Sequence, residues 1–210
     1  MLGKENRSSC MKRLKLVKSK MEENPDKAAV LVPLCMYNDK LGFLYTLRSK
    51  KVKMNQGQVC FPGGKVDEID KNLEETALRE TWEELKIPRE SVDIWGIGNF
   101  IGRKNLSVYP VIGYIGKIDP TNLMINTQEV EEAFVYPLEK LCDPSYCRYT
   151  QFKNNYTLPT YLGEKHKIWG LTAIITHIVM SALLPDVYTL KLPYAQLTDD
   201  KELKSNYTYK

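Results

Sequence analysis

The spacing of apolar residues predicts a domain that alternates strands with helices. Apolar or alternating runs typical of strands cover residues 28–35, 42–48, 59–61, 92–100, 108–118 and 132–136. Helical patterns are carried by an acidic segment that ends near Ile87 and by a long apolar run over 168–184. Strands that flank one acidic helix, with a further helix near the C-terminus, favour an α/β fold, an α/β/α sandwich around a mixed β-sheet.

The first 27 residues carry a basic pattern with a helical stripe of apolar residues. Met11, Leu14, Val17 and Met21 recur at helical spacing among many lysines and arginines. A mitochondrial presequence has this character, and so does a surface helix that packs an apolar stripe against a domain. The residues alone favour the packed helix.

Length and composition fit one soluble globular domain. The chain has 210 residues, of which 43% are hydrophobic and 27% charged. We expect a basic N-terminal segment over 1–27, the globular domain itself over 28–197 and a polar tail over 198–210. A net charge of +4, spread among 26 acidic residues, gives no case for nucleic acid as a partner.

The cysteine content and the hydropathy of the chain argue against three further classes of protein. The five cysteines are odd in number and form no CxxC pair, which argues against a disulfide framework and a zinc site and fits a reducing compartment. No run of about 18 apolar residues exists, so we expect no membrane span.

The candidate chemistry lies in the acidic helix. Glu80, Glu83 and Glu84 stand at i, i+3 and i+4, so they share one helical face. A solvated acidic face is the commonest explanation of such a run. Here the pair Gly63 and Gly64 ends a strand just upstream, and unpaired carboxylates repel one another unless a cation offsets them, so we predict a divalent metal site. Carboxylate oxygens suit Mg²⁺ or Mn²⁺.

Arg79 is the predicted support of these acids. It lies four residues before Glu83 and four after Glu75, so its rigid, always charged guanidinium can hold carboxylates in place. Asp70 or Asn72 is expected to cap the helix.

The stretch 63–87 resembles the signature of the Nudix hydrolases: Gly, later Glu, then Arg-Glu-hydrophobic-x-Glu-Glu-x-Gly-hydrophobic. Thr81 takes the hydrophobic position and Lys86 the closing glycine. Counted back from Arg79, Lys71 stands at the first glutamate and Lys65 at the leading glycine. The resemblance implies metal held by Glu80 and Glu84, with Glu83 assisting.

A second pattern upstream is similar to that of one Nudix subgroup, the coenzyme A diphosphatases. It comprises Leu44, Thr46, Leu47, Arg48, Ser49, Gly57, Phe61, Pro62, Gly63 and Gly64. Tyr45 and Lys53 depart from it. The segments YTLPTYL and KIWGLTAIIT further resemble mitochondrial members of this subgroup.

This resemblance implies metal-dependent hydrolysis of the diphosphate bond of coenzyme A or acyl-coenzyme A, giving adenosine 3',5'-bisphosphate and a 4'-phosphopantetheine. Arg48, Lys53, Gly63 and Gly64 are the implied substrate contacts, and a mitochondrial location is favoured over a cytoplasmic one. The alternatives are a Nudix hydrolase of NADH or ADP-ribose and a Nudix-like binding module without turnover.

The last two assignments from the sequence concern the general base and Trp169. The general base is Glu83, Glu84, Glu129 or Glu132, because a base must reach the attacking water. Trp169 is expected to pack in the core of the last helix in preference to stacking on a base.

Overall fold

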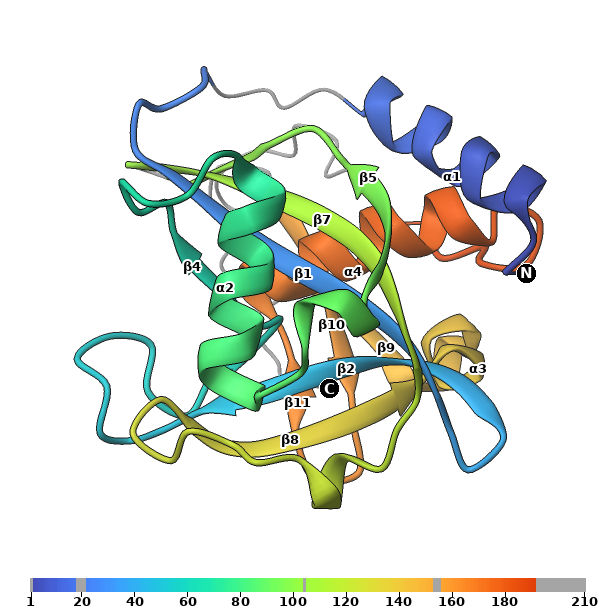
Figure 1. Ribbon diagram of the computed structural model, residues 1–210. Helices are drawn as coiled ribbons and strands as arrows, with labels where there is room; N and C mark the ends of the chain where they lie inside the picture. Colours follow the sequence, from blue (N-terminus) through green and yellow to red (C-terminus); the bar gives the residue numbers. More distant parts are fainter. Residues whose placement is uncertain (1, 18–21, 104, 153–155, 192–210) are drawn as a thin grey trace.

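The computed structural model describes residues 2–17, 22–103, 105–152 and 156–191 (Figure 1). The helices are α1 (Lys4–Leu16), α2 (Leu73–Leu85), α3 (Leu138–Cys142) and α4 (Gly170–Leu183). The strands of the main sheet are β1 (Lys27–Tyr37), β2 (Lys40–Arg48), β3 (Val59–Cys60), β4 (Gly63–Lys65), β5 (Asp93–Ile97), β6 (Ile101–Arg103), β7 (Leu106–Lys117) and β8 (Val130–Pro137). A second sheet holds β9 (Cys147–Phe152), β10 (Tyr156–Leu162) and β11 (Lys167–Ile168).

The main sheet is mixed. Its strand order is β3-β2-β1-β7-β5, and β4 pairs with β1, β6 with β7 and β8 with β2. β1 and β7 are parallel, whereas the other pairs are antiparallel. The chain passes from β3, on β2, to β4, on β1, through Phe61 and Pro62. This crossing brings both glycines of the Gly63–Gly64 pair beneath α2.

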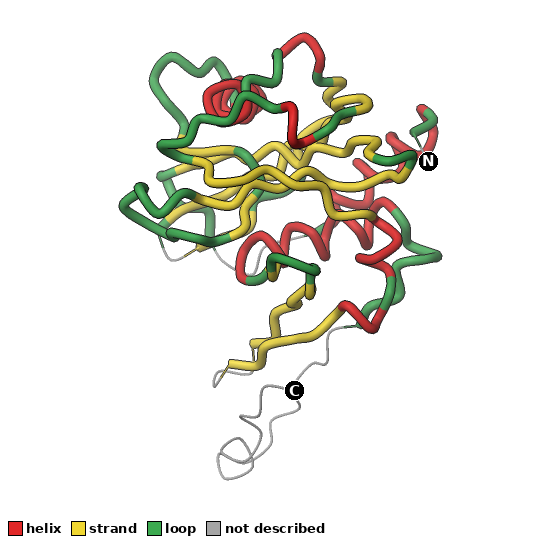
Figure 2. Tube along the Cα trace, turned by 90° about the horizontal axis from the view of Figure 1, so that it is seen from below, coloured by secondary structure: helices red, strands yellow, loops and turns green. Residues whose placement is uncertain are grey.

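Helices cover both faces of the main sheet, which confirms the predicted α/β/α sandwich. Seen edge-on in Figure 2, α2 lies on one side of the strands, and α4 and α1 lie on the other. The buried residues accordingly form two clusters, one beneath α2 and one beneath α4 and α1. Among the described residues, no helix is both long and apolar enough to cross a lipid bilayer.

The β1–β2 hairpin sets which side chains face each layer. Asn38 and Asp39 both have positive φ, 49° and 57°, as a two-residue turn between twisted strands requires. Along β2, Leu44 then faces the α2 cluster, while Tyr45 and Leu47 face the α4 cluster. Arg48, the last residue of β2, is therefore on the α2 side.

The small sheet was not predicted from the sequence. Its strands β9 and β10 pair with each other in an antiparallel hairpin, and β11 adds two residues at Tyr161 and Leu162. Their apolar alternation is weak because β9 is mostly exposed, and the buried positions 159–161 of β10 carry proline, threonine and tyrosine in place of aliphatic residues. Lys167 and Ile168 belong to β11, so the last helix begins two residues later than its apolar run.

The N-terminal basic segment forms a helix that packs on the domain. Cys10, Met11 and Leu14 of α1 are buried against α4 and β5. At the C-terminal end of α1, Asn99 Nδ2 donates to the carbonyls of Lys15 and Val17, at 2.8 and 2.7 Å. Met21 of the predicted stripe lies outside the described residues. The division of the chain at residue 27 stays a prediction.

Leu14→Ala is expected to lower the free energy of unfolding by about 2–4 kcal/mol, because Leu14 is only 1% exposed and its truncation leaves a cavity between α1 and α4. Urea unfolding of the full chain measures this loss. The control is Leu16→Ala, on the same helix but 78% exposed, which is expected to change stability by less than about 0.5 kcal/mol. Equal, small effects of both variants would mean that α1 does not belong to the folded unit.

Candidate active site

The acidic helix α2 begins and ends with defined caps. The side chain of Asn72 accepts a hydrogen bond from the Glu75 amide at 2.9 Å, which confirms one of the two predicted caps. At the other end, Lys86 adopts the left-handed conformation, φ 54° and ψ 28°, and its amide donates to the Trp82 carbonyl. The helix therefore ends as a glycine would end it, at the modest cost of a left-handed non-glycine residue.

Thr81 fills the hydrophobic position of the helix without leaving a polar atom unpaired. Its side chain is fully buried, and its hydroxyl donates to the Ala77 carbonyl at 2.7 Å. The hydroxyl is thus satisfied within the helix, and the methyl group remains for packing.

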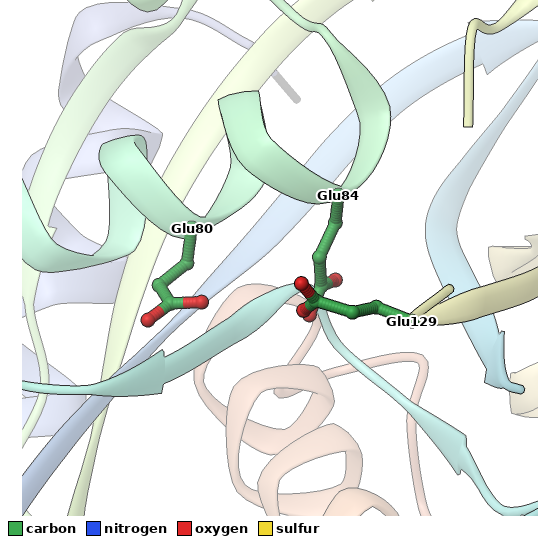
Figure 3. A group of neighbouring side chains, drawn as sticks. All are labelled: Glu80, Glu84 and Glu129. Carbon is green, nitrogen blue, oxygen red and sulfur yellow. The ribbon is translucent and has the colours of Figure 1, made fainter. Parts of the chain in front are cut away.

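Three glutamates converge beside the C-terminal half of α2 (Figure 3). One carboxylate oxygen from each of Glu80, Glu84 and Glu129 lies within 4.8 Å of the others. Glu80 and Glu84 are one helical turn apart on α2, whereas Glu129 reaches in from the loop before β8. The sequence alone leaves Glu129 as one of two candidates from its region.

Backbone hydrogen bonds hold the Glu129 loop against α2. The Asn126 amide donates to the Glu84 carbonyl at 2.8 Å, and the amides of Glu129 and Val130 both donate back to the Asn126 carbonyl. On its other side, the Glu129 carbonyl accepts from the Ser49 amide at 2.8 Å. The loop is therefore fixed to the end of α2 and to the end of β2 at once.

Arg79 binds four oxygen-bearing partners from its buried position on α2. Its Nε and Nη2 donate to the two carboxylate oxygens of Asp70, at 2.9 and 3.0 Å, as a bidentate pair. Nη2 also donates to the Lys65 carbonyl, and Nη1 donates to Glu80 at 3.0 Å and to Glu83 at 3.3 Å. Arg79 thus ties β4 and the turn before α2 to the carboxylate of Glu80. Glu75 pairs instead with Arg89.

Asp70→Asn is expected to lower the free energy of unfolding at pH 7 by about 2 kcal/mol, because hydrogen bonds from Arg79 lower the pKa of the buried Asp70 carboxyl to about 2. A lowered pKa adds stability above the unfolded-state pKa of about 3.9, and this stability is lost as pH falls through about 2. Urea unfolding at a series of pH values should show the difference in free energy of unfolding between wild type and variant closing as the pH falls from about 3.9 to about 2. Asp186→Asn, at an exposed carboxylate, serves as the control, and a gap that does not depend on pH would contradict this role for Asp70.

The two glycines of the turn are placed where a side chain does not fit. A Cβ on Gly64 would lie 2.4 Å from the carboxylate carbon and one oxygen of Glu80. A Cβ on Gly63, whose φ is 152°, would lie 2.4 Å from the Ala29 carbonyl oxygen on β1. Glu80 thus rests directly on the backbone of β4, an approach that a Cβ on Gly64 would prevent.

The environment of Glu84 is unfavourable for an isolated carboxylate. Glu84 is 2% exposed, and its Oε2 has no hydrogen-bond partner among the described residues. Burial, reinforced by the charge of Glu80, raises the pKa of Glu84 to about 8, although the charge of Arg48 and the amide of Gly63 oppose the rise. Burial also raises the pKa of Glu80. Arg79, bonded to Glu80, and Arg48, near Glu84, therefore offset the burial and mutual repulsion of these two carboxylates only in part.

A divalent cation fits this group of side chains. All three donors are carboxylates, the hard oxygen ligands that Mg²⁺ and Mn²⁺ prefer, and an orphaned oxygen on a buried glutamate is costly without a partner. Solvated acidic clusters need no ion, but Glu84 is not solvated.

Other acids named from the sequence take different positions. Glu83 lies outside the group of three glutamates, with a side chain 46% exposed and bonded to Arg79. Glu132 pairs with Leu47 across β2 and so lies on the face away from α2, where Lys165 and His166 both bind its carboxylate. Of the four candidate bases, Glu84 and Glu129 are the ones in the group of three.

Two of the predicted substrate contacts lie near the end of β2. Arg48 is half-buried with its Nε unpaired among the described residues, and it is close enough to Glu84 to lower the pKa of that carboxyl. Lys53 is exposed in the loop 49–58, which leaves β2 and returns into β3. A positive charge thus stands beside the acidic group, and a second lies on the loop next to it.

Comparison with known proteins gives a match to the NUDIX domain model over residues 26–156. The chain is 38% identical over 197 residues to the human mitochondrial coenzyme A diphosphatase NUDT8, covering 91% of this chain and 84% of that protein. Identity to mouse NUDT8 is also 38%, over 93% of this chain and 96% of that protein. The mouse peroxisomal coenzyme A diphosphatase NUDT7 is 29% identical over 80% of this chain and 75% of its own length.

Among solved structures, the chain resembles a Caenorhabditis elegans Ap4A hydrolase in a binary complex. The TM-score is 0.45 at 24% identity, and the match covers 54% of this chain and 81% of that one.

Proposed function

The chain belongs to the NUDIX family, and we propose that it hydrolyses the diphosphate bond of coenzyme A or an acyl-coenzyme A. The products would be adenosine 3',5'-bisphosphate and 4'-phosphopantetheine or its acyl derivative. The observation that carries the chemistry is the convergence of Glu80, Glu84 and Glu129, with one oxygen of Glu84 buried and unpaired. The substrate is proposed from the named activity of the relatives that cover most of this chain.

We propose that Glu80, Glu84 and Glu129 hold Mg²⁺ or Mn²⁺, with Glu83 as an assisting carboxylate at the rim. When bound, such a cation supplies positive charge against the diphosphate oxygens and makes a water molecule more acidic. Burial of Glu84 keeps bulk water from competing for its carboxylate.

Protein groups outside the acidic cluster orient and bind. Arg79 fixes Glu80 by a hydrogen bond of 3.0 Å while Asp70 holds the guanidinium in place. The absence of a side chain at Gly64 lets the backbone of β4 approach Glu80, and its absence at Gly63 lets β4 lie close against β1. Arg48, with an unpaired Nε, is proposed to donate to a substrate phosphate, and Lys53 to attract one as a point charge. Glu84 and Glu129 are the proposed candidates for accepting a proton from the attacking water.

Turnover of a substrate panel tests this function. The purified full chain is incubated with Mn²⁺ and with coenzyme A, NADH or ADP-ribose, and the products are separated by chromatography. Coenzyme A is expected to give the highest kcat/KM. A preference for NADH or ADP-ribose would move the chain to another Nudix specificity, and no product from any of the three would favour a binding module without turnover.

We also propose a mitochondrial location. Both NUDT8 relatives are named mitochondrial, and residues 4–16 form a basic helix of the kind that import signals contain. Cell fractionation of the tagged full chain tests the location, and recovery in the cytosol would contradict it.

A further inference from the structure

Trp169 is exposed, although a packed position was expected from its apolar surroundings in the sequence. Its side chain is 46% exposed, and it is the N-cap residue of α4, so it precedes the helical face that packs on the sheet. Lys167 Nζ stands 5.8 Å from the centroid of the Trp169 ring. A large aromatic ring that stays in water beside a cation is a candidate contact for a ligand.

The start of α4 is tied to the strand that borders the acidic group. One turn after Trp169, the Thr172 hydroxyl donates to the Val59 carbonyl of β3 at 2.9 Å, and β11 also lies against β3. Burial raises the pKa of the thiol of Cys60, the other residue of β3, and the nearby charge of Glu84 raises it further. The two residues of β3 therefore connect the start of α4, next to Trp169, with the acidic group.

The strand register places Trp169 at the end of β2 that carries Arg48. Leu47 pairs with Val59 on one side and with Glu132 on the other, so these three residues run in a line on the face beneath β11. The next residue, Arg48, faces the acidic group. Trp169 and Arg48 thus lie on opposite faces of the same strand end, where the loop 49–58 begins.

The strand that leads to Trp169 is held on this face. In the turn between β10 and β11, Lys165 and His166 bind the carboxylate of Glu132 at 2.6 and 2.9 Å, and the His166 ring lies 5.1 Å from that of Phe134. Ile168 is fully buried, so the backbone next to Trp169 is anchored. The exposed ring therefore extends from a fixed support.

We propose that Trp169, with Lys167, is the surface on which the aromatic base of the substrate's nucleotide half stacks. This inference rests on the proposed function, in which that half is an adenosine carrying a 3'-phosphate. An exposed indole offers a π-face to the base, and the ammonium of Lys167 attracts the phosphate. A substrate whose diphosphate lies at the acidic group would reach this surface past the end of β2 and the loop 49–58. Trp169 would thus determine binding of the base and take no part in bond cleavage.

Trp82 offers a matched control. Its ring is also half-exposed and also carries a lysine, Lys86, with Nζ 5.3 Å from its centroid. It lies two residues from both Glu80 and Glu84 on α2, about 200° around the helix from each, and so faces away from the acidic group. Trp82→Ala therefore removes a similarly exposed aromatic ring from a surface that faces away from the acidic group.

The test measures KM and kcat for coenzyme A with Mn²⁺ in Trp169→Ala, Trp169→Phe and Trp82→Ala. Trp169→Ala is expected to raise KM about tenfold, within the range for loss of one base–aromatic stack, with kcat within about twofold of wild type. Phenylalanine should restore most of the affinity, and Trp82→Ala should behave as wild type. A Trp169→Ala enzyme whose KM stays within twofold of wild type would overturn the proposal.

A second readout needs neither metal nor turnover. Titration with adenosine 3',5'-bisphosphate is expected to quench tryptophan fluorescence in wild type and in Trp82→Phe, and the quench should vanish in Trp169→Phe. Persistence of the quench in Trp169→Phe would overturn the proposal. If wild type does not hydrolyse coenzyme A, the proposed function fails, and the stacking surface is then judged by this quench alone.

Discussion

Replacing Glu84 by glutamine is expected to lower kcat for coenzyme A at least about a thousandfold, a loss of about 4 kcal/mol in transition-state stabilisation. Glu84 is the most buried of the three converging glutamates, and its unpaired oxygen is the strongest sign of a cation in the described structure. A carboxamide has the same shape but only one neutral acceptor. Hydrolysis is measured at saturating coenzyme A and Mn²⁺.

The fold of the Glu84→Gln variant should survive. Its new amide N–H group can donate to the neighbouring carboxylate of Glu80 or Glu129, so repulsion among three acids becomes attraction. The melting temperature without metal is therefore expected to equal or exceed that of wild type, while Mn²⁺ should raise it in wild type alone. Glu83→Gln, at the half-exposed acid outside the group, should cost about tenfold or less in kcat. A Glu84→Gln enzyme within tenfold of wild type would contradict the metal assignment.

Gly63→Ala is expected to lower the free energy of unfolding by about 3 kcal/mol or more, the second large effect. The new Cβ would lie 2.4 Å from the Ala29 carbonyl oxygen and 2.5 Å from the Val30 Cα, both backbone atoms of the central strand β1. Neither can move without breaking the pairing of β1 with β4. Urea unfolding of the soluble variant, or its recovery in inclusion bodies, measures the effect.

Gly57→Ala separates crowding from backbone conformation. Gly57 also has a positive φ, 65°, but a Cβ added there would have nothing within 4 Å of it. Alanine there should cost only about 1 kcal/mol, the ordinary penalty of a left-handed residue. Equal losses at the two glycines would show that the approach of β4 to β1 is not what requires Gly63.

The parts of the fold that follow from local pattern were predictable. Buried runs predicted β1, β2, β3, β5, β7 and β8 of the main sheet, and Asn72 capped α2 as its side chain allows. The short strands β4 and β6 were not predicted, and the glycine pair that was expected to end a strand instead begins β4. The sheet β9–β11 was missed because most of β9 is exposed and the buried positions of β10 carry proline, threonine and tyrosine, so no aliphatic strand pattern marks them. Trp169 was expected to be packed because it lies inside the apolar run 168–184, whereas the helix begins only at Gly170 and Trp169 is its N-cap residue.

The site was predictable along the helix and unpredictable across the chain. Glu80 and Glu84, separated by one turn, project together, and the position of Glu83, about 60° around the axis from Glu80, lets Arg79 take its carboxylate. Glu129 and Glu132 could not be separated from the sequence, because the face on which each lies depends on where β8 begins to pair with β2. Their assignment needs the register and the hydrogen bond from Asn126 to Glu84.

Identification of the products from coenzyme A tests the central claim most directly. The purified full chain with Mn²⁺ is predicted to yield adenosine 3',5'-bisphosphate and 4'-phosphopantetheine in equal amounts, with neither formed in excess chelator. Intact coenzyme A, or cleavage to dephospho-coenzyme A and phosphate, would contradict the account.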